Sequence, residues 1–222
     1  MKMRTHNKQC NKEKDKKMLH LRIHPENPQP RLISQAVERI RAGDVIVYPT
    51  DAAYAIGCQI GNKSAMERIS QIRGLGPKHQ YAIICADLSD IATYAKVDNA
   101  MYRLLKNNTP AVTTFILPAT SEVPRRLMHP KKKTIGLRIP SNPICRMLLK
   151  ELGEPLLTST LILPNQTEPL DDPYDIELQI GNRIDVLVDG GLGTLSTTSI
   201  VDLSGNNPEI IRRGVGDVSA FE

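Results

Sequence analysis

Arginine, lysine and hydroxyl side chains gather at the ends of predicted strands and helices, where they could bind an anion. In residues 71–79, Arg73 and Lys78 flank a loop that contains glycine. An arginine fork can donate hydrogen bonds to two phosphate oxygens, so this pattern predicts a phosphate-binding loop. The alternative is that a cation at the end of a helix binds the free carbonyl groups of that helix.

Three more segments carry polar side chains next to predicted strands. Residues 48–57 include the end of the first buried strand, and ligands of open α/β sheets bind at such ends; the alternative is a turn that serves only the fold. Arg138 alternates with buried aliphatic residues, so it needs a partner, either an anionic ligand or an internal carboxylate. Residues 197–199 lead into the last predicted hairpin, and Arg212 lies at its far end.

The familiar motifs of covalent and metal-dependent catalysis do not occur in the sequence. G-x-S-x-G, H-E-x-x-H, G-x-x-x-x-G-K-[ST] and a G-x-G-x-x-G after a strand are all absent, so no covalent nucleophile is expected. His20 and His24 lack the further ligands of a metal site, and we expect no structural metal. The four cysteines stand alone, at positions 10, 58, 85 and 145.

The sequence predicts a cytoplasmic protein with no membrane partner. Isolated cysteines fit a reducing compartment and argue against a disulfide framework. No apolar run reaches the roughly 18 residues that span a bilayer. The basic N-terminus has no apolar stretch after it, so it does not resemble a secretory signal.

Charge is distributed unevenly along the chain. Residues 1–17 carry a net charge of +5, which equals the formal net charge of the whole chain, and they are predicted to be a disordered basic arm. Residues 63–146 carry +9 and residues 147–222 carry −9. The basic middle segment could face an anionic ligand; alternatively, folding interleaves the two segments and their fields cancel.

Apolar periodicity predicts a sheet with helices packed on it. Helices are predicted over residues 31–42, 63–72, 98–106, 143–152 and 173–181. Strands are predicted over residues 45–48, 81–85, 113–117, 134–139, 156–163 and 184–188, with a hairpin of 198–203 and 209–212. The alternation gives an α/β (α+β) fold, and the hairpin makes the sheet mixed. Since no linker or repeat interrupts residues 18–222, we expect a single domain there.

In their order along the chain, the polar segments resemble the motifs of the YrdC-like threonylcarbamoyl-adenylate synthase family. The matching residues are 49–54 (P-T-D-A-A-Y), 71–73 (Q-I-R), 138–143 (R-I-P-S-N-P), 198–202 (T-S-I-V-D) and 212–214 (R-R-G). The resemblance covers about residues 18–222. Residues 123–127, 133–143 and 214–217 resemble the YciO branch of the family in particular.

The resemblance implies a fold and a reaction. The fold is a twisted mixed β-sheet with flanking helices and a basic concave face. The reaction is that of a threonylcarbamoyl-AMP synthase-like nucleotidyltransferase, which joins ATP, L-threonine and bicarbonate, with Mg²⁺ accompanying the nucleotide, for tRNA adenosine modification. Such a reaction can proceed by positioning the substrates and neutralising the triphosphate, without a protein nucleophile.

The resemblance also implies, by position, which residues form the site. The expected substrate-binding residues are Thr50, Tyr54 and Thr160. The expected nucleotide-binding residues are Arg73, Lys78, Arg138, Ser141, Thr198, Ser199 and Arg212.

Four residues depart from the family pattern. Gln71 replaces a lysine, Ala52 a threonine, Ala55 a glycine, and Ile162 the asparagine of a Ser-Ala-Asn motif. Each departure affects a substrate contact rather than the fold, so the synthase reaction would be slow or altered in substrate.

The alternative function is a double-stranded RNA- or ribosome-associated binding protein that keeps the fold without the reaction. The candidate RNA-binding residues are Arg125, Arg126, Lys131, Lys132 and Lys133. No aromatic residue lies among them, so base stacking is poorly supported and contacts to duplex phosphates are favoured. The same contacts could recognise a tRNA.

Overall fold

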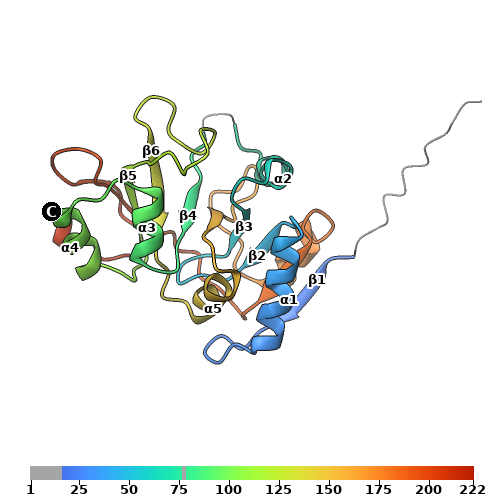
Figure 1. Ribbon diagram of the computed structural model, residues 1–222. Coiled ribbons are helices and arrows are strands. Elements are labelled where there is room, and N and C mark those ends of the chain that lie inside the picture. The colour runs from blue at the N-terminus through green and yellow to red at the C-terminus, as the bar shows by residue number, and fades with distance from the viewer. Residues whose placement is uncertain (1–16, 77–78) are drawn as a thin grey trace, which may run out of the picture.

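The computed structural model describes residues 17–76 and 79–222, which contain a ten-stranded sheet with helices on both faces (Figure 1). The strands are β1 (Leu19–Arg22), β2 (Ile46–Tyr48), β3 (Ala55–Gln59), β4 (Ala82–Ile84), β5 (Thr113–Pro118), β6 (Thr134–Arg138), β7 (Leu156–Thr160), β8 (Val186–Asp189), β9 (Ser199–Asp202) and β10 (Glu209–Arg212). Their order across the sheet is β1-β8-β2-β3-β7-β4-β6-β5-β9-β10. The predicted arm, apart from Lys17, and the candidate Lys78 lie outside the described residues.

The sheet mixes parallel and antiparallel pairs, as the sequence predicted. β8 pairs in parallel with β1 and β2, and β4–β6 and β5–β9 are also parallel. The other neighbouring strands are antiparallel, including the predicted hairpin of β9 and β10. The predicted mixed α/β fold is therefore confirmed.

Local capping signals fix the ends of the helices. The helices are α1 (Pro30–Arg41), α2 (Lys63–Arg73), α3 (Leu88–Tyr94), α4 (Asn99–Asn107), α5 (Pro143–Leu152) and α6 (Pro173–Ile180), followed by a 3-10 helix, η1 (Ser219–Phe221). In α5, the side chain of Asn142 accepts a hydrogen bond from the N–H of Cys145, and Gly153 ends the helix with a positive φ of 74°. Only glycine adopts that conformation without steric cost. Among the described residues, no helix has both the length and the apolar character needed to cross a membrane.

One face of the sheet is covered by helices across most of its width. α2, α3, α4 and α6 pack there against the apolar side chains that alternate along the strands. In β5 and β6, these inward side chains are Phe115, Leu117, Ile135 and Leu137. Because side chains on a strand alternate between faces, the residues between them must point to the opposite face.

The opposite face is covered over only part of the sheet. α1 and α5 pack together against β1, β8 and β2 (Figure 1). Their apolar cluster extends as far as Leu156 of β7 and Ile84 of β4. Over β5, β6 and β9, the residues that point to this face include Thr114, Gly136 and Arg138, and none of them belongs to an apolar cluster. This uncovered half of the sheet carries the candidate site.

Four elements were missed in the sequence: β1, β3, α3 and η1. β1 has four residues and lies at the edge of the sheet, where among the described residues it pairs with β8 alone. α3 does carry a local signal, because the side chain of Asp87 accepts hydrogen bonds from the N–H groups of Ser89 and Asp90 at its start.

Candidate functional site

A cavity of about 250 Å³ lies on the uncovered half of the sheet. Its walls come from β3 to β7, β9 and β10 and from the loops beside them. The polar side chains in its lining are the hydroxyls of Thr50, Thr114, Thr158, Ser159, Thr160 and Thr198, the side chains of His79, Gln80 and Tyr81, and the guanidinium groups of Arg73, Arg138 and Arg212.

A row of paired residues across four strands, with alanine and glycine at its centre, forms the cavity floor. In β4 and β6, Ala82 pairs with Gly136, and the row continues to Thr158 on one side and Ile116 on the other. A Cβ atom added at Gly136 would lie 3.2 Å from Cγ2 of Thr114 and 3.4 Å from Cβ of Ala82. The space above the floor therefore depends on the absence of a side chain at Gly136.

Arg73 reaches the cavity from the end of α2. Gly74 ends this helix with a positive φ of 62°, and the Arg73 side chain turns to the neighbouring strand β7 and the loop after it. Its Nε donates a hydrogen bond to the carbonyl of Ile162 at 3.2 Å, and its Nη1 donates to Oγ of Ser159. The side chain of Arg73 thus binds a carbonyl group outside its own helix. The alternative stated from the sequence was that it would bind the free carbonyl groups at the end of that helix. Burial lowers the pKa of its guanidinium, against an opposing effect of Tyr81.

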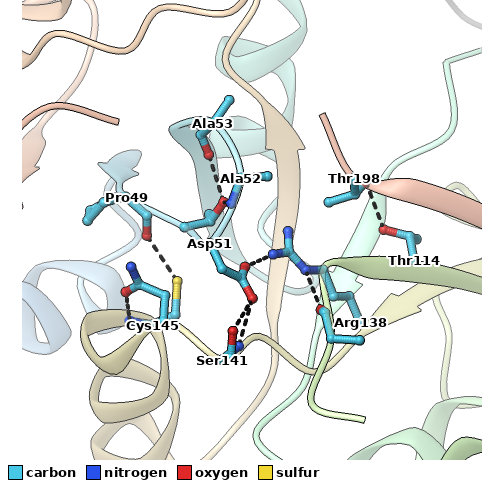
Figure 2. Close-up of polar contacts among 12 residues, drawn as sticks. Pro49, Asp51, Ala52, Ala53, Thr114, Arg138, Ser141, Cys145 and Thr198 are labelled. Atoms are coloured by element: carbon cyan, nitrogen blue, oxygen red, sulfur yellow. Dashed lines mark hydrogen bonds and ion pairs between the residues drawn. The ribbon is translucent and has the colours of Figure 1, made fainter. Parts of the chain in front are cut away.

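Arg212 enters the cavity from the other end, on β10. Its Nε donates to the carbonyl of Thr198 at 2.9 Å and its Nη2 donates to the hydroxyl of the same residue at 3.0 Å. That hydroxyl lies 3.4 Å from the hydroxyl of Thr114 (Figure 2). Burial lowers the pKa of the Arg212 guanidinium, yet arginine stays charged in proteins.

Arg138 has an internal carboxylate partner. Figure 2 shows Asp51 between Arg138 and Ser141. Arg138 forms an ion pair with Asp51, whose second oxygen accepts hydrogen bonds from N and Oγ of Ser141 at 2.8 and 2.7 Å. Nε of Arg138 donates to the carbonyl of Ala111 at 3.3 Å. Of the two alternatives that the sequence left open, this carboxylate supplies the partner, and the nucleotide-binding role of Arg138 stays a prediction.

The cavity carries positive charge from Arg73 and Arg212. Within residues 17–76 and 79–222, neither Arg73 nor Arg212 forms an ion pair with a carboxylate, and the lining contains no aspartate or glutamate. Two half-buried cations in a concave surface favour an anionic ligand, because low-dielectric walls strengthen their field.

The predicted Mg²⁺ has no protein ligand in this lining. Mg²⁺ prefers carboxylate oxygens, water and substrate phosphates, and Asp51 is already paired with Arg138. In the part of the chain that the structure describes, no three His, Cys, Asp or Glu side chains come together as metal ligands. The residues therefore do not fit a protein-held metal here.

The two predicted substrate-binding threonines lie in the lining. Thr50 donates its hydroxyl to the carbonyl of Ala53 at 2.7 Å, which closes the turn after β2. Thr160 pairs with Ala55 of β3 at the end of β7. The structure thus brings both hydroxyls to the same wall, and their contacts with substrate stay a prediction.

Three other predicted residues hold the loops around the cavity and do not line it. Tyr54 donates its buried hydroxyl to the carbonyl of Gly191 at 2.7 Å, and Ser199 donates to the carbonyl of Gly216 at 2.7 Å. Ser141 binds Asp51, as described above. Their direct roles in binding ligands stay predictions.

The buried cysteines offer no nucleophile to the cavity. Cys58, Cys85 and Cys145 are free thiols in the interior. Burial raises the pKa of Cys58 and of Cys145 to about 12 and raises that of Cys85 as well. Because the thiolate is the reactive form, these thiols are inert near neutral pH.

His79 and Ser159 are cavity residues that the sequence analysis missed. Nε2 of His79 lies 3.2 Å from Oγ of Ser159, and the imidazole packs edge-on against the ring of Tyr81. Burial and the neighbouring Arg73 lower the pKa of His79 to about 4. His79 follows Lys78 in the predicted phosphate loop, so its position was a signal that could have found it.

Comparison with known proteins identifies the family. The model of the Sua5, YciO and YrdC proteins, described as "Telomere recombination", matches residues 38–214. The chain belongs to the Sua5/YciO/YrdC family. The resemblance seen in the sequence is thereby confirmed.

Relatives within the Sua5/YciO/YrdC family cover most of the chain. YciO of Escherichia coli (strain K12) is 51% identical over 199 residues, which are 90% of this chain and 97% of that protein. Its crystal structure superposes with a TM-score of 0.88 over 92% of this chain and 100% of its own. Threonylcarbamoyl-AMP synthase of Halorhodospira halophila is 28% identical over 77% of this chain and 89% of that protein.

A more distant member of the family shares the fold. Sua5 of P. abyssi in complex with L-threonine is 22% identical and matches with a TM-score of 0.79. The match covers 89% of this chain and 57% of that one.

Three of the four departures from the Sua5/YciO/YrdC pattern line the cavity. Ala52, Ala55 and Ile162 all contribute to its wall, so the wall is less polar than the family motifs would make it. Gln71 is different, because it is exposed on α2 and outside the lining. Its carbonyl accepts a hydrogen bond from Arg183 at 2.8 Å.

The candidate RNA-binding residues lie together on the loop between β5 and β6 (Figure 1). All five are exposed: Arg125, Arg126, Lys131, Lys132 and Lys133. Arg126 donates to the carbonyl of Gly61, and Lys132 pairs with Asp202 at 3.2 Å. The structure therefore groups these cations on one loop, and their role in RNA binding stays a prediction.

Proposed function

We propose that the chain is an ATP-binding, threonylcarbamoyl-AMP synthase-like nucleotidyltransferase, slow or altered in its amino-acid substrate, and linked to tRNA adenosine modification. One observation carries this proposal most directly. Arg73 and Arg212 enter one cavity from two separate elements, and neither has a carboxylate partner among the described residues. A nucleoside triphosphate is an anion that such a pair of cations would hold through charge-assisted hydrogen bonds.

The cavity residues suit a reaction that depends on positioning. Arg73 and Arg212 would neutralise the phosphates, and Thr198, held by Arg212, would orient the nucleotide. The Arg138–Asp51 pair fixes one wall and brings no net charge. Fixed donors that point to developing negative charge can supply most of the catalysis in such a site. Any Mg²⁺ would arrive with the phosphates, as part of the substrate.

The relatives support the choice of substrates. One is named a threonylcarbamoyl-AMP synthase, and another was crystallised with L-threonine. Thr50 and Thr160 would face the amino acid with their hydroxyl groups. Because Ala52 and Ala55 offer methyl groups where the family motif has a hydroxyl and a glycine, we expect a different preference among amino acids, or slower turnover with threonine.

A pyrophosphate-release assay tests this function. The chain would be incubated with ATP, bicarbonate and each of a panel of amino acids that includes L-threonine. We expect release that requires both bicarbonate and an amino acid, and that falls in Arg212→Ala but not in Arg125→Ala, whose side chain is exposed on the β5–β6 loop. Release that ignores bicarbonate and every amino acid would contradict the synthase proposal.

RNA binding by the β5–β6 loop is a second candidate function. The observation that favours it is the exposure of five cations on one loop with no aromatic residue among them. If the cavity bound no nucleotide, the chain would bind RNA through this loop and would not carry out the synthase reaction.

A further inference from the structure

A histidine lies beside Arg73, one of the two cavity cations that have no carboxylate partner among the described residues. Nε2 of His79 is 3.2 Å from Oγ of Ser159, and Nη1 of Arg73 donates to that same oxygen. The three side chains come from the segment before β4, from β7 and from the end of α2. They therefore form a contiguous polar group in the wall of the cavity.

The hydrogen bonds of this group fit a neutral His79 whose Nε2 carries no proton. Because Arg73 donates to Oγ of Ser159, the hydroxyl hydrogen of Ser159 is free to point to His79. In this arrangement Nε2 accepts that hydrogen, which requires the neutral imidazole. The pKa of about 4, which burial and then Arg73 produce, agrees with a neutral ring near neutral pH.

The surroundings of His79 explain why an anion would change its protonation. Among the described residues, the groups shown to face it are Arg73 from α2, Ser159 from β7 and Tyr81, two residues further along the chain. Among the described residues, none of these neighbours is a carboxylate that could stabilise an imidazolium. A phosphate bound by Arg73 would neutralise that cation and place negative charge beside the ring.

We propose that His79 is a proton-coupled anion-binding residue, which takes up a proton when a phosphate group enters the cavity beside Arg73. The proton comes from solvent and binds to Nε2. Ser159 then accepts hydrogen bonds from both His79 and Arg73 and turns its own hydrogen to the phosphate. This inference rests on the proposed function, because it takes the anion to be a phosphate of the nucleotide.

The coupling has a defined sign. If anion binding favours the protonated ring, then by linkage a lower pH favours anion binding. The gain is limited to about tenfold in affinity per pH unit for one proton. It ends at low pH, once the ligand-free ring is itself protonated, and at high pH, where the bound ring is neutral too.

Sulfate is the probe for this coupling, because its own charge is constant over the range from about pH 5 to about pH 8 in which a histidine titrates. Isothermal titration calorimetry in two buffers with different ionisation heats would count the protons taken up per sulfate. We expect proton uptake in the wild-type chain, sulfate affinity that rises as pH falls, and displacement of sulfate by ATP. The proton count in the wild-type chain needs no variant, so a folding defect cannot mask it.

Two histidine variants then locate the proton. His79→Gln keeps a hydrogen-bonding side chain but cannot be protonated, so we expect no proton uptake and an affinity that does not change with pH. His129→Gln is the matched control, since His129 lies on the β5–β6 loop, outside the lining, where it accepts hydrogen bonds from the N–H groups of Lys131 and Lys132. It should behave as the wild type, and circular dichroism checks that both variants fold.

The contrary results separate this inference from the proposed function. If ATP displaces sulfate but binding takes up no proton, or His79→Gln takes up as many as the wild type, the role of His79 is refuted and the nucleotide site stands. If neither sulfate nor ATP binds the wild-type chain, both proposals fail.

Discussion

At the residue scale, the three arginines that reach the cavity differ in whether a carboxylate of the protein matches their charge. Arg138 is 5% exposed and forms an ion pair with Asp51, so its charge is matched within the protein. Arg73 and Arg212 bind only carbonyl and hydroxyl oxygens among the described residues. The first arginine stabilises the cavity wall, and the other two have charge to offer to a ligand.

Removal of either ligand-facing arginine should weaken nucleotide binding. A charge-assisted hydrogen bond contributes about 1.5–3 kcal/mol, so Arg73→Ala and Arg212→Ala should each lower ATP affinity roughly ten- to a hundredfold. Equilibrium titration with ATP measures the effect, and circular dichroism checks the fold. Arg125→Ala is the control, because that arginine is exposed on the β5–β6 loop. Unchanged affinity in both folded cavity variants would refute their assignment to the phosphates.

Removal of the carboxylate partner of Arg138 should destabilise the fold. Asp51→Ala leaves a buried, unpaired cation, which costs about 3–5 kcal/mol in the free energy of unfolding. Urea unfolding measures this loss. The double variant Asp51→Ala/Arg138→Met removes both charges and should recover much of the stability. A single variant as stable as the wild type would show that the pair is not needed.

At the element scale, the cavity exists because α1 and α5 cover only part of one face of the sheet. The strands beyond them present small and hydroxyl side chains in place of the apolar ones that a helix would need. The alternation in β6 illustrates this, since Ile135 and Leu137 enter the core while Gly136 and Arg138 face the cavity.

A side chain at Gly136 should block the cavity without disrupting β6. Valine suits a strand, and its Cβ needs only small shifts of Thr114 and Ala82. We expect Gly136→Val to lower ATP affinity about tenfold or more, since overlap with a ligand readily costs more than about 1.4 kcal/mol. ATP titration and thermal unfolding measure the two effects. Gly205→Ala, in the turn between β9 and β10 and outside the lining, is the control. Normal binding in Gly136→Val would place the ligand elsewhere.

At the scale of the whole molecule, folding interleaves part of the charge that is separated along the sequence. Lys132 of the basic middle segment pairs with Asp202 of the acidic segment at 3.2 Å, and Arg68 pairs with Asp185 at 2.7 Å. The cavity and the β5–β6 loop still present cations of the middle segment. Of the two alternatives that the sequence left open, cancellation of charge applies to these ion pairs. A basic surface that could face an anionic ligand remains in the cavity and on the β5–β6 loop.

Any RNA binding by the molecule should be electrostatic and tolerant of sequence. We expect similar affinity for unrelated duplexes, weaker binding to matched single strands, and a steep loss of affinity with salt. The triple variant Arg125→Ala/Lys131→Ala/Lys133→Ala should reduce the salt slope by about 0.9 for each phosphate that the variant no longer neutralises.

Titration at several salt concentrations, with the full chain and with a chain that starts at residue 18, measures this binding. Complete loss of binding on trimming would mean that residues 18–222 have no RNA site. A strong preference for one single strand, with no effect of salt, would contradict the electrostatic account.

The sequence by itself determined the features that depend on local pattern. The boundaries of α5 followed from Pro143 and Gly153, because the conformations of proline and glycine limit a helix directly. The β9–β10 hairpin followed from two short strands around a turn, and the mixed sheet from helices that alternate with strands. The segments around Arg73 and Arg212 were also visible, since charged residues at strand and helix ends form a local signal.

The tertiary structure decided everything that depends on the order of strands in the sheet. That order places Asp51 on Arg138, so the partner of this arginine could not be chosen from sequence. It buries Tyr54 and Ser199 beneath loops and brings Ser159 to both Arg73 and His79. These contacts join residues far apart in the chain, and the burial of the whole sheet, rather than any local propensity, determines which of them meet.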